Sequence, residues 1–148
     1  MDIYTIGFTK KSAEKFFSLL KNNKIDALFD IRLNNTSQLA GFTKYPDIEF
    51  FLKHICNIKY IHDIKLAPTD KILHDYKKNV ITWDDYVNLF DQLMERRCIN
   101  EYLVSKYADL FKNNRVCLLC SESTPERCHR SLVAARVSNA FDSKIVNL

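Results

Sequence analysis

The sequence predicts an α/β protein, a three-layer sandwich with a mostly parallel central sheet and an added helical segment at about residues 69–112. Three observations support this fold class. Short apolar runs alternate with segments of helical period along the chain. Hydrophobic residues make up 47% and charged residues 27% of the chain, enough for an ordinary core and surface. Only two glycines and three prolines occur, so no linker divides the 148 residues, and we expect a single domain, residues 1–148.

The first half of the chain is predicted to run strand, helix, strand, helix, strand. Residues 3–6 form a short β-rich run that stops at Gly7, and Ser12 then opens an amphipathic helix. Residues 27–31 are apolar on both faces, as in a buried parallel strand. A helix at residues 46–55 and a strand at residues 59–61 follow.

Residues 69–112 are mostly helical in period, which predicts helices packed beside the sheet. Trp83, Tyr86 and Phe90 recur at helical spacing, and we interpret them as core residues. Lys77 is interpreted as part of a solvated helix face.

The last third of the chain contains the most strand-like run, residues 115–120. Thr124 follows it with the residue type of an N-cap, and a proline and an acid come next, as in a first helical turn. A helix is therefore predicted to begin at Thr124. The chain closes with a short strand at residues 144–146.

Composition excludes several classes of protein. A membrane-spanning helix needs about 18 consecutive apolar residues, and charged residues interrupt every apolar run of this chain before it reaches that length. The first residues lack the basic and apolar regions of a secretory signal, so we expect a cytoplasmic protein with no membrane partner. A net charge of +4 permits an anionic ligand. An odd number of scattered cysteines favours reduced thiols over a disulfide framework: Cys56, Cys98, Cys117, Cys120 and Cys128.

Polar side chains gather where the predicted strands end. Ligands of open parallel sheets bind in the crevice at the carboxyl ends of the strands, so these positions are the candidate site. The segment of residues 120–130 is the richest, because it combines a strand end, hydroxyl groups and a helix start. The candidate catalytic residues are Asp30, Glu122 and His129, and the candidate ligand-binding residues are Gly7, Thr9, Arg32, Ser123, Thr124 and Arg130. We expect Asp30, Arg32, Glu122 and Arg130 to share one crevice.

Each charged group in this set has two interpretations. Asp30 and Arg32 project to the same side of their strand, so they form either a mutual ion pair or an anion site in which the guanidinium forks the ligand. The helix start can hold a phosphate or carboxylate, or Glu122 and Glu126 can satisfy its N–H groups instead.

The cysteines of the segment also have two interpretations. Cys128 near a helix N-terminus can be a nucleophilic thiolate, or Cys120 and Cys128 can be small buried residues. Adjacent helical residues point about 100° apart, so we do not expect Cys128 and His129 to aim at one ligand as directly as a catalytic pair. We expect Cys128 to pack inward along the apolar face, which would leave Arg130 freer for a ligand.

Cys117 and Cys120 have the C-x-x-C spacing found in zinc sites. On an extended strand these two positions face opposite sides, and leucines rather than turn residues lie between them. We therefore expect no metal and no other cofactor.

Several of these motifs match a known family. The chain resembles the DUF488 family of small uncharacterised α/β proteins in residues 5–7, 30–32, 66–69, 118–122 and 125–131. The resemblance implies an α/β fold with these segments near one end of the sheet, and it implies no reaction. The chain departs from many relatives at Phe8, where they have a histidine, and at residues 34–35 and 37–38, where they have a proline and a Ser-Arg pair.

Two functions remain open at this point. The first is an enzyme or binding domain for a phosphate-bearing ligand, an anionic small molecule or a nucleic acid, held by Arg32, Arg130 and the helix start. The second is a non-catalytic protein interaction module whose cleft residues satisfy one another. Closed ion pairs without a cavity would favour the second.

Overall fold

The computed structural model describes all residues from Met1 to Leu148 and contains one five-stranded sheet. The strand order is β3-β2-β4-β1-β5, and every neighbouring pair is parallel. The strands are β1 (Asp2–Gly7), β2 (Ala27–Asp30), β3 (Lys59–His62), β4 (Val116–Cys120) and β5 (Lys144–Asn147). The predicted α/β class is confirmed, and the sheet is parallel throughout.

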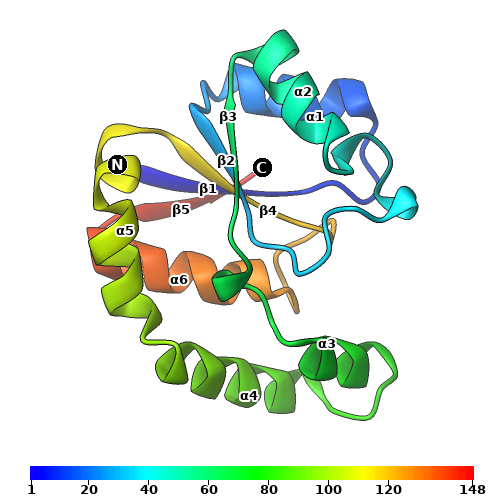
Figure 1. The fold of residues 1–148 in the computed structure, drawn as a ribbon, viewed down its shortest axis with the longest axis vertical. Helices are drawn as coiled ribbons and strands as arrows, with labels where there is room; N and C mark the ends of the chain where they lie inside the picture. The colour runs from blue at the N-terminus through cyan, green and yellow to red at the C-terminus, as the bar shows by residue number, and fades with distance from the viewer.

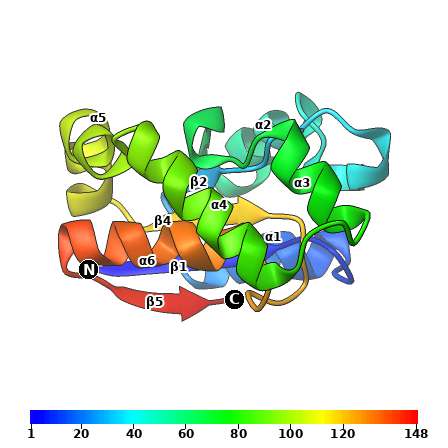
Figure 2. The ribbon, with the colours of Figure 1, turned by 90° about the horizontal axis from the view of Figure 1, so that it is seen from below.

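Helices cover both faces of the sheet, which gives the predicted three layers (Figures 1 and 2). One face carries α1 (Ala13–Asn22), α2 (Asp47–Phe51) and the π-helical turn η2 (Leu52–Cys56). The other carries α3 (Asp70–Lys77), α4 (Trp83–Arg96), α5 (Ile99–Asn113) and α6 (His129–Phe141). Short 3₁₀ turns lie in two of the loops, η1 (Gln38–Thr43) and η3 (Ile64–Leu66).

Two hydrophobic cores hold the layers together, and β4 contributes to both. Val116 and Leu118 belong to the core beneath α3–α6, whereas Cys117 and Leu119 belong to the core beneath α1 and α2. All five residues of β4 are buried, as a central parallel strand requires. The alternation along this strand places Cys117 and Cys120 on opposite faces of the sheet, as the sequence predicted.

Local signals in the sequence account for most element boundaries. The Ser12 side chain caps α1 by accepting a hydrogen bond from the backbone N–H of Lys15 at 3.1 Å. All four residues of β2 are buried, which confirms the strand predicted from its apolar run. The helical insertion predicted at residues 69–112 is present as α3, α4 and α5.

The predicted start of the last helix is wrong. It begins at His129 with Cys128 as the N-cap, not at Thr124. Arg127 has a φ of 53°, a left-handed conformation that a continuous right-handed helix from Thr124 excludes. Tertiary hydrogen bonds explain the difference, because Thr9 and Arg130 each hold a carbonyl of the preceding loop, and these contacts override the local capping signal.

The chain connections place a crevice at the carboxyl end of β4. From β1 and β2 the chain continues to α1 and α2 on one face, and from β4 it continues to α6 on the other. In the sheet β4 lies between β2 and β1. The connections that leave these two neighbours cover one face of the sheet, and the connection that leaves β4 covers the other. Ligand sites of open parallel sheets form at such switch points. None of the helices combines the length and the apolar character that crossing a membrane requires.

Candidate functional site

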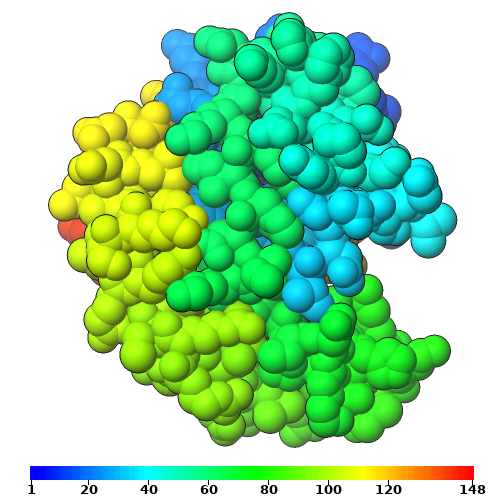
Figure 3. All heavy atoms as spheres, in the orientation of Figure 1, coloured from blue at the N-terminus to red at the C-terminus, as the bar shows by residue number.

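A cavity of about 160 Å³ lies at the carboxyl ends of β2 and β4. This volume equals that of about five water molecules in the liquid. Figure 3 shows the surface notched between the segment that follows β2 and the helix α3. The lining residues come from four parts of the chain: Arg32, Leu33, Asn34, Pro68, Leu73, Tyr76, Lys77, Trp83, Tyr86, Cys120, Ser121, Glu122, Arg127, Cys128 and His129.

One wall of the cavity is aromatic and comes from the helical insertion. The rings of Trp83 and Tyr86 stack with centroids 5.0 Å apart, and Tyr76 packs against both. Trp83 and Tyr86 both line the cavity; Tyr86 is buried, as predicted, whereas Trp83 is only partly buried. The helical period indicates which residues face inward, and it cannot distinguish a core from a cavity wall.

Cations outnumber acids around the cavity. Arg32, Lys77 and Arg127 line it, and Glu122 is the one acidic residue that does. Lys77 and Arg127 are exposed and form no ion pair within the protein. Sequence reasoning interpreted Lys77 as part of a solvated helix face, and it considered Arg127 only as a positive charge near the Cys128 thiol, not as a ligand-binding residue.

Asp30 and Arg32 form a buried, two-pronged ion pair. Nε of Arg32 donates to Oδ1 of Asp30 at 2.8 Å, and Nη2 donates to Oδ2 at 2.7 Å. Nη1 and Nη2 also donate to the hydroxyl and carbonyl of Thr43. These bonds occupy four of the five N–H groups of the guanidinium. Of the two interpretations of this pair, the structure shows the mutual ion pair.

A tyrosine completes the surroundings of this ion pair. The Tyr60 hydroxyl donates to Oδ2 of Asp30 at 2.6 Å and accepts a hydrogen bond from the Asn35 amide at 2.9 Å. Burial, together with the negative charge of Asp30, raises the pKa of Tyr60 well above its usual value. Tyr60 therefore stays protonated and acts as a donor to the carboxylate.

Three groups with reactive side chains meet at the floor of the cavity. The Sγ atoms of Cys120 and Cys128 and a ring nitrogen of His129 all lie within 4.8 Å of one another. Nδ1 of His129 is 3.5 Å from Sγ of Cys120, and Nε2 is 2.9 Å from the carbonyl oxygen of Ile31. A carbonyl only accepts, so Nε2 carries the proton and Nδ1 is the unprotonated nitrogen. Sγ of Cys120 lies beside the ring, 4.0 Å from Nε2. Two thiols and an imidazole can serve acid–base chemistry or bind a transition metal.

The structure shows why Cys128 and His129 can face the same point. Cys128 has the extended backbone of an N-cap, with φ of −130° and ψ of 137°, and His129 is the first helical residue. The 100° separation expected of neighbours on a helix therefore does not apply to this pair. The expectation that they would not aim at one ligand is wrong because the N-cap is Cys128, four residues after the predicted N-cap Thr124.

The protonation states of these groups differ. The adjacent Cys128 thiol lowers the pKa of Cys120, and the Ser121 backbone and the charge of Arg130 act in the same direction against burial. Burial lowers the pKa of His129, which favours the neutral imidazole. Cys120 is thus the thiol of the pair that ionises more readily.

Arg130 lies beneath the loop of residues 121–128 rather than in the cavity. Its side chain is fully buried, and Nη1 donates to the carbonyl of Glu122 at 3.0 Å. Its Nε and Nη2 have no hydrogen-bond partner in the protein. The expectation that Arg130 would be freer for a ligand than Cys128 is wrong, because Arg130 supports the loop from below and Cys128 lines the cavity.

Gly7 and Thr9 hold the same loop from the end of β1. A Cβ on Gly7 would lie 1.6 Å from the carbonyl oxygen of Glu122 and 2.6 Å from Nη1 of Arg130, so only glycine fits. The N–H and hydroxyl of Thr9 both donate to the carbonyl of Ser121. These residues position the loop.

The candidate residues therefore separate into three groups. Arg32, Glu122 and His129 line the cavity. Asp30 and Arg130 are fully buried, and neither is among the lining residues. The remaining candidates lie in or beside the loop without lining the cavity: Gly7, Thr9, Ser123 and Thr124.

Comparison with protein-family models gives one match. The model of DUF488, a domain of unknown function, matches residues 12–137 of the 148-residue chain. The chain belongs to the DUF488 family. No curated protein and no solved structure matched it.

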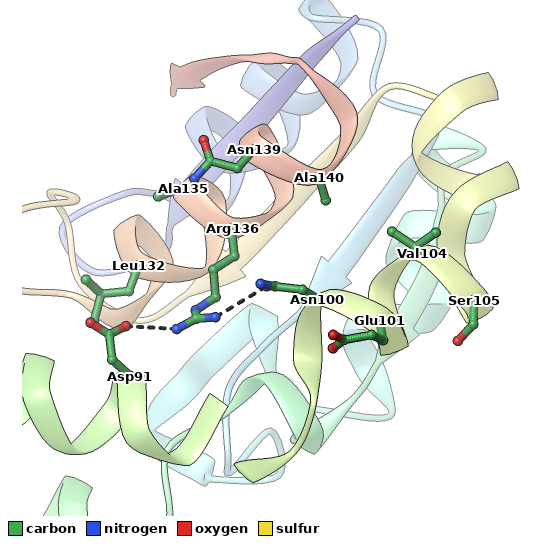
Figure 4. A pocket seen from close by; sticks show the side chains of 10 residues that line it. All are labelled: Asp91, Asn100, Glu101, Val104, Ser105, Leu132, Ala135, Arg136, Asn139 and Ala140. Atoms are coloured by element: carbon green, nitrogen blue, oxygen red, sulfur yellow. Dashed lines mark hydrogen bonds and ion pairs between the residues drawn. The ribbon is translucent and has the colours of Figure 1, made fainter. Parts of the chain in front are cut away.

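The DUF488 chain has a second, larger hollow of about 870 Å³, lined by residues of α4, α5 and α6 (Figure 4). Arg136 reaches across it to Asp91, Glu95 and Asn100, at 3.2, 3.0 and 3.3 Å. The cation of this hollow, Arg136, is therefore neutralised by ion pairs with Asp91 and Glu95, and the other lining charge is the acid Glu101. The smaller cavity, which the strand ends and the reactive side chains share, is the candidate site of this DUF488 domain.

Proposed function

We propose that the protein binds, or binds and acts on, a small ligand with a phosphate or similar anionic group in the cavity at the carboxyl ends of β2 and β4. The observation that carries this proposal is the charge of the lining, in which unpaired Lys77 and Arg127 face a cavity with one acidic residue. The stacked Trp83 and Tyr86 offer a flat surface for an apolar or ring-shaped part of the ligand.

The volume limits what the ligand can be. A cavity that holds about five waters accommodates an anionic group with a short or planar attachment. A nucleotide would extend from the cavity toward the exposed Lys77 and Arg127, so these residues would meet its phosphate at the rim. His129 and Glu122 are the candidate acid–base groups that line the cavity, and Asp30 is a positioning residue because it holds Arg32 from beneath.

The alternative, a non-catalytic interaction module, is favoured by the closed Asp30–Arg32 pair. The cavity and the unpaired cations at its rim favour the ligand site instead. The two functions differ in one measurable property, which is saturable binding of a small anion.

Trp83 is the single tryptophan of the chain, so its fluorescence reports occupancy of the cavity. We would titrate the metal-free protein with inorganic phosphate and a panel of phosphate monoesters, including nucleoside monophosphates, each beside its uncharged parent. Saturable quenching by the esters and not by the parents is expected. Arg127→Ala and Lys77→Ala should each weaken binding about 10-fold or more, the value of a charge-assisted hydrogen bond, and Lys78→Ala should not.

Lys78 is a matched control because it is exposed, adjacent to Lys77 and absent from the lining. Equal responses to esters and parents, or equal losses in Lys77→Ala and Lys78→Ala, would contradict the proposal. A short oligonucleotide tests the nucleic-acid form, whose affinity should fall steeply with salt.

A further inference from the structure

We propose that Cys120, Cys128 and His129 form a binding site for one thiophilic transition-metal ion, with Zn²⁺ the best match to these ligands, at the floor of the cavity. The proposal goes beyond anion binding and does not depend on it, since the metal alone is the probe.

The distances suit a tetrahedral ion. With Zn–S bonds of about 2.3 Å and Zn–N bonds of about 2.0–2.1 Å, sulfur and nitrogen ligands lie about 3.5 Å apart. Nδ1 of His129 and Sγ of Cys120 are separated by 3.5 Å. The third group, Sγ of Cys128, lies within 4.8 Å of both, so a small rotation of its side chain closes the set.

The histidine is held as metal-binding histidines usually are. Its Nε2–H donates to the Ile31 carbonyl at 2.9 Å, which leaves Nδ1 as the nitrogen that can bind a metal. Sγ of Cys120 lies beside the ring, 3.5 Å from Nδ1 and 4.0 Å from Nε2, so binding requires a rotation that turns the Nδ1 lone pair toward the ion. Metal-ligating histidines almost always donate their other ring N–H to a carbonyl, carboxylate or water. The carbonyl comes from the end of β2, so the neighbouring strand sets the orientation of a ligand that follows β4.

The ligand types select the metal. Two thiolates and a neutral imidazole suit Zn²⁺ and other thiophilic ions, whereas Mg²⁺ and Ca²⁺ require oxygen ligands. Asp30, on the adjacent strand, has no free lone pair for a metal, because Oδ1 accepts from the backbone N–H and Nε of Arg32 and Oδ2 accepts from Nη2 of Arg32 and the Tyr60 hydroxyl. Two thiolates also neutralise the charge of a divalent ion. The metal and its ligands together would therefore add no net positive charge near Arg32 at the floor of the cavity.

The site would have an open coordination position. All three ligands line the cavity, so a fourth ligand can approach the ion from the cavity side. Three protein ligands with an open fourth position are the pattern of catalytic rather than structural zinc sites. In agreement with this, two hydrophobic cores on opposite faces of the sheet hold the fold, and we expect the metal-free protein to be folded.

The test uses the full chain, stripped of metal with a chelator and kept reduced. We would titrate it with Co²⁺, whose thiolate charge-transfer and d–d absorption bands report sulfur ligation and tetrahedral geometry, and then displace Co²⁺ with Zn²⁺. One equivalent of Co²⁺ with both sets of bands is expected. Cys120→Ser and Cys128→Ser should lose the bands, and Cys98→Ser, which changes an exposed cysteine outside the site, should keep them.

A second measurement needs no variant and guards against misfolding. Zn²⁺ should protect Cys120 and Cys128 of the unmodified chain from alkylation, read residue by residue by mass spectrometry, while Cys98 stays reactive. Substoichiometric binding, absorption without thiolate bands, or no protection of these two cysteines would overturn the proposal. Binding of phosphate esters to the metal-free protein, followed by Trp83 fluorescence, would separately decide the proposed function.

Discussion

The Asp30–Arg32 pair provides a sharp test of how the site is supported. The change Asp30→Asn removes a carboxylate that accepts hydrogen bonds from the guanidinium of Arg32 and from the hydroxyl of Tyr60. An asparagine there keeps the shape but presents an NH₂ group to partners that are themselves donors. The Arg32 charge would then be buried, with its side chain only 4% exposed, and have no counter-ion.

Removing one partner of a buried ion pair costs about 3–5 kcal/mol, because the other charge stays desolvated. Domains are stable by about 5–15 kcal/mol, so Asp30→Asn should remove a large part of the total. For a chain of this size the melting temperature should fall by about 6–20 °C. Urea unfolding followed by circular dichroism measures the change in the free energy of unfolding directly.

The double variant Asp30→Asn with Arg32→Met is the control. It removes both charges at once, so it should be more stable than Asp30→Asn alone, with a coupling of about 1–3 kcal/mol between the two positions. If Asp30→Asn cost less than about 1 kcal/mol, the pair would have the energy of a solvated surface pair, and the reasoning from its burial would be refuted.

Three further changes test buried contacts, two beside the site and one between the end of β3 and α5. Gly7→Ala should destabilise the protein by about 1–3 kcal/mol or more, since its Cβ would overlap the Glu122 carbonyl, and it should expose the loop to proteolysis; unchanged stability and proteolysis would contradict this. Tyr60→Phe should cost about 1–3 kcal/mol by urea unfolding, because the buried carboxylate of Asp30 loses a donor, and a loss within error would contradict it. Burial acts to raise the pKa of Asp63, but hydrogen bonds from two tyrosine hydroxyls and a backbone N–H lower it by more, so the pKa lies below the usual 3.8. Its contribution to stability should therefore be present at neutral pH and be lost as the pH falls through the folded-state pKa, so unfolding free energies of Asp63→Asn and the unmodified chain should converge in acid.

The sequence by itself determined the order and type of the elements. The buried run of β2, the Ser12 cap of α1 and the helical period of residues 69–112 depend on hydrogen bonds and side-chain directions within a few residues. The rule that ligands bind at the carboxyl ends of parallel strands also located most of the candidate site from the sequence alone. It succeeds because the carboxyl ends of parallel strands lie along the same edge of the sheet.

Only the tertiary structure decided where the last helix begins. Thr124 and the proline after it carry a genuine capping signal, but Arg127 adopts a left-handed conformation and the helix starts at His129. The loop is held by Arg130 of α6 and, from outside, by Thr9, whose contact with the loop depends on the pairing of β1 with β4. A local signal cannot report that pairing.

The composition of the site was likewise a tertiary outcome. The approach of Cys128 and His129 to Cys120 depends on the helix start, and the turn of the imidazole depends on a carbonyl that follows β2, 98 residues earlier. Trp83 joins the cavity because the helical insertion packs over the end of β4, and Arg127 joins it from the loop that precedes α6. Periodicity indicates which face of a helix or strand is apolar. The residues that pack against this face are set by the order of the strands in the sheet. Strand order depends on the free energy of contacts between segments far apart in the chain, which a local pattern does not contain.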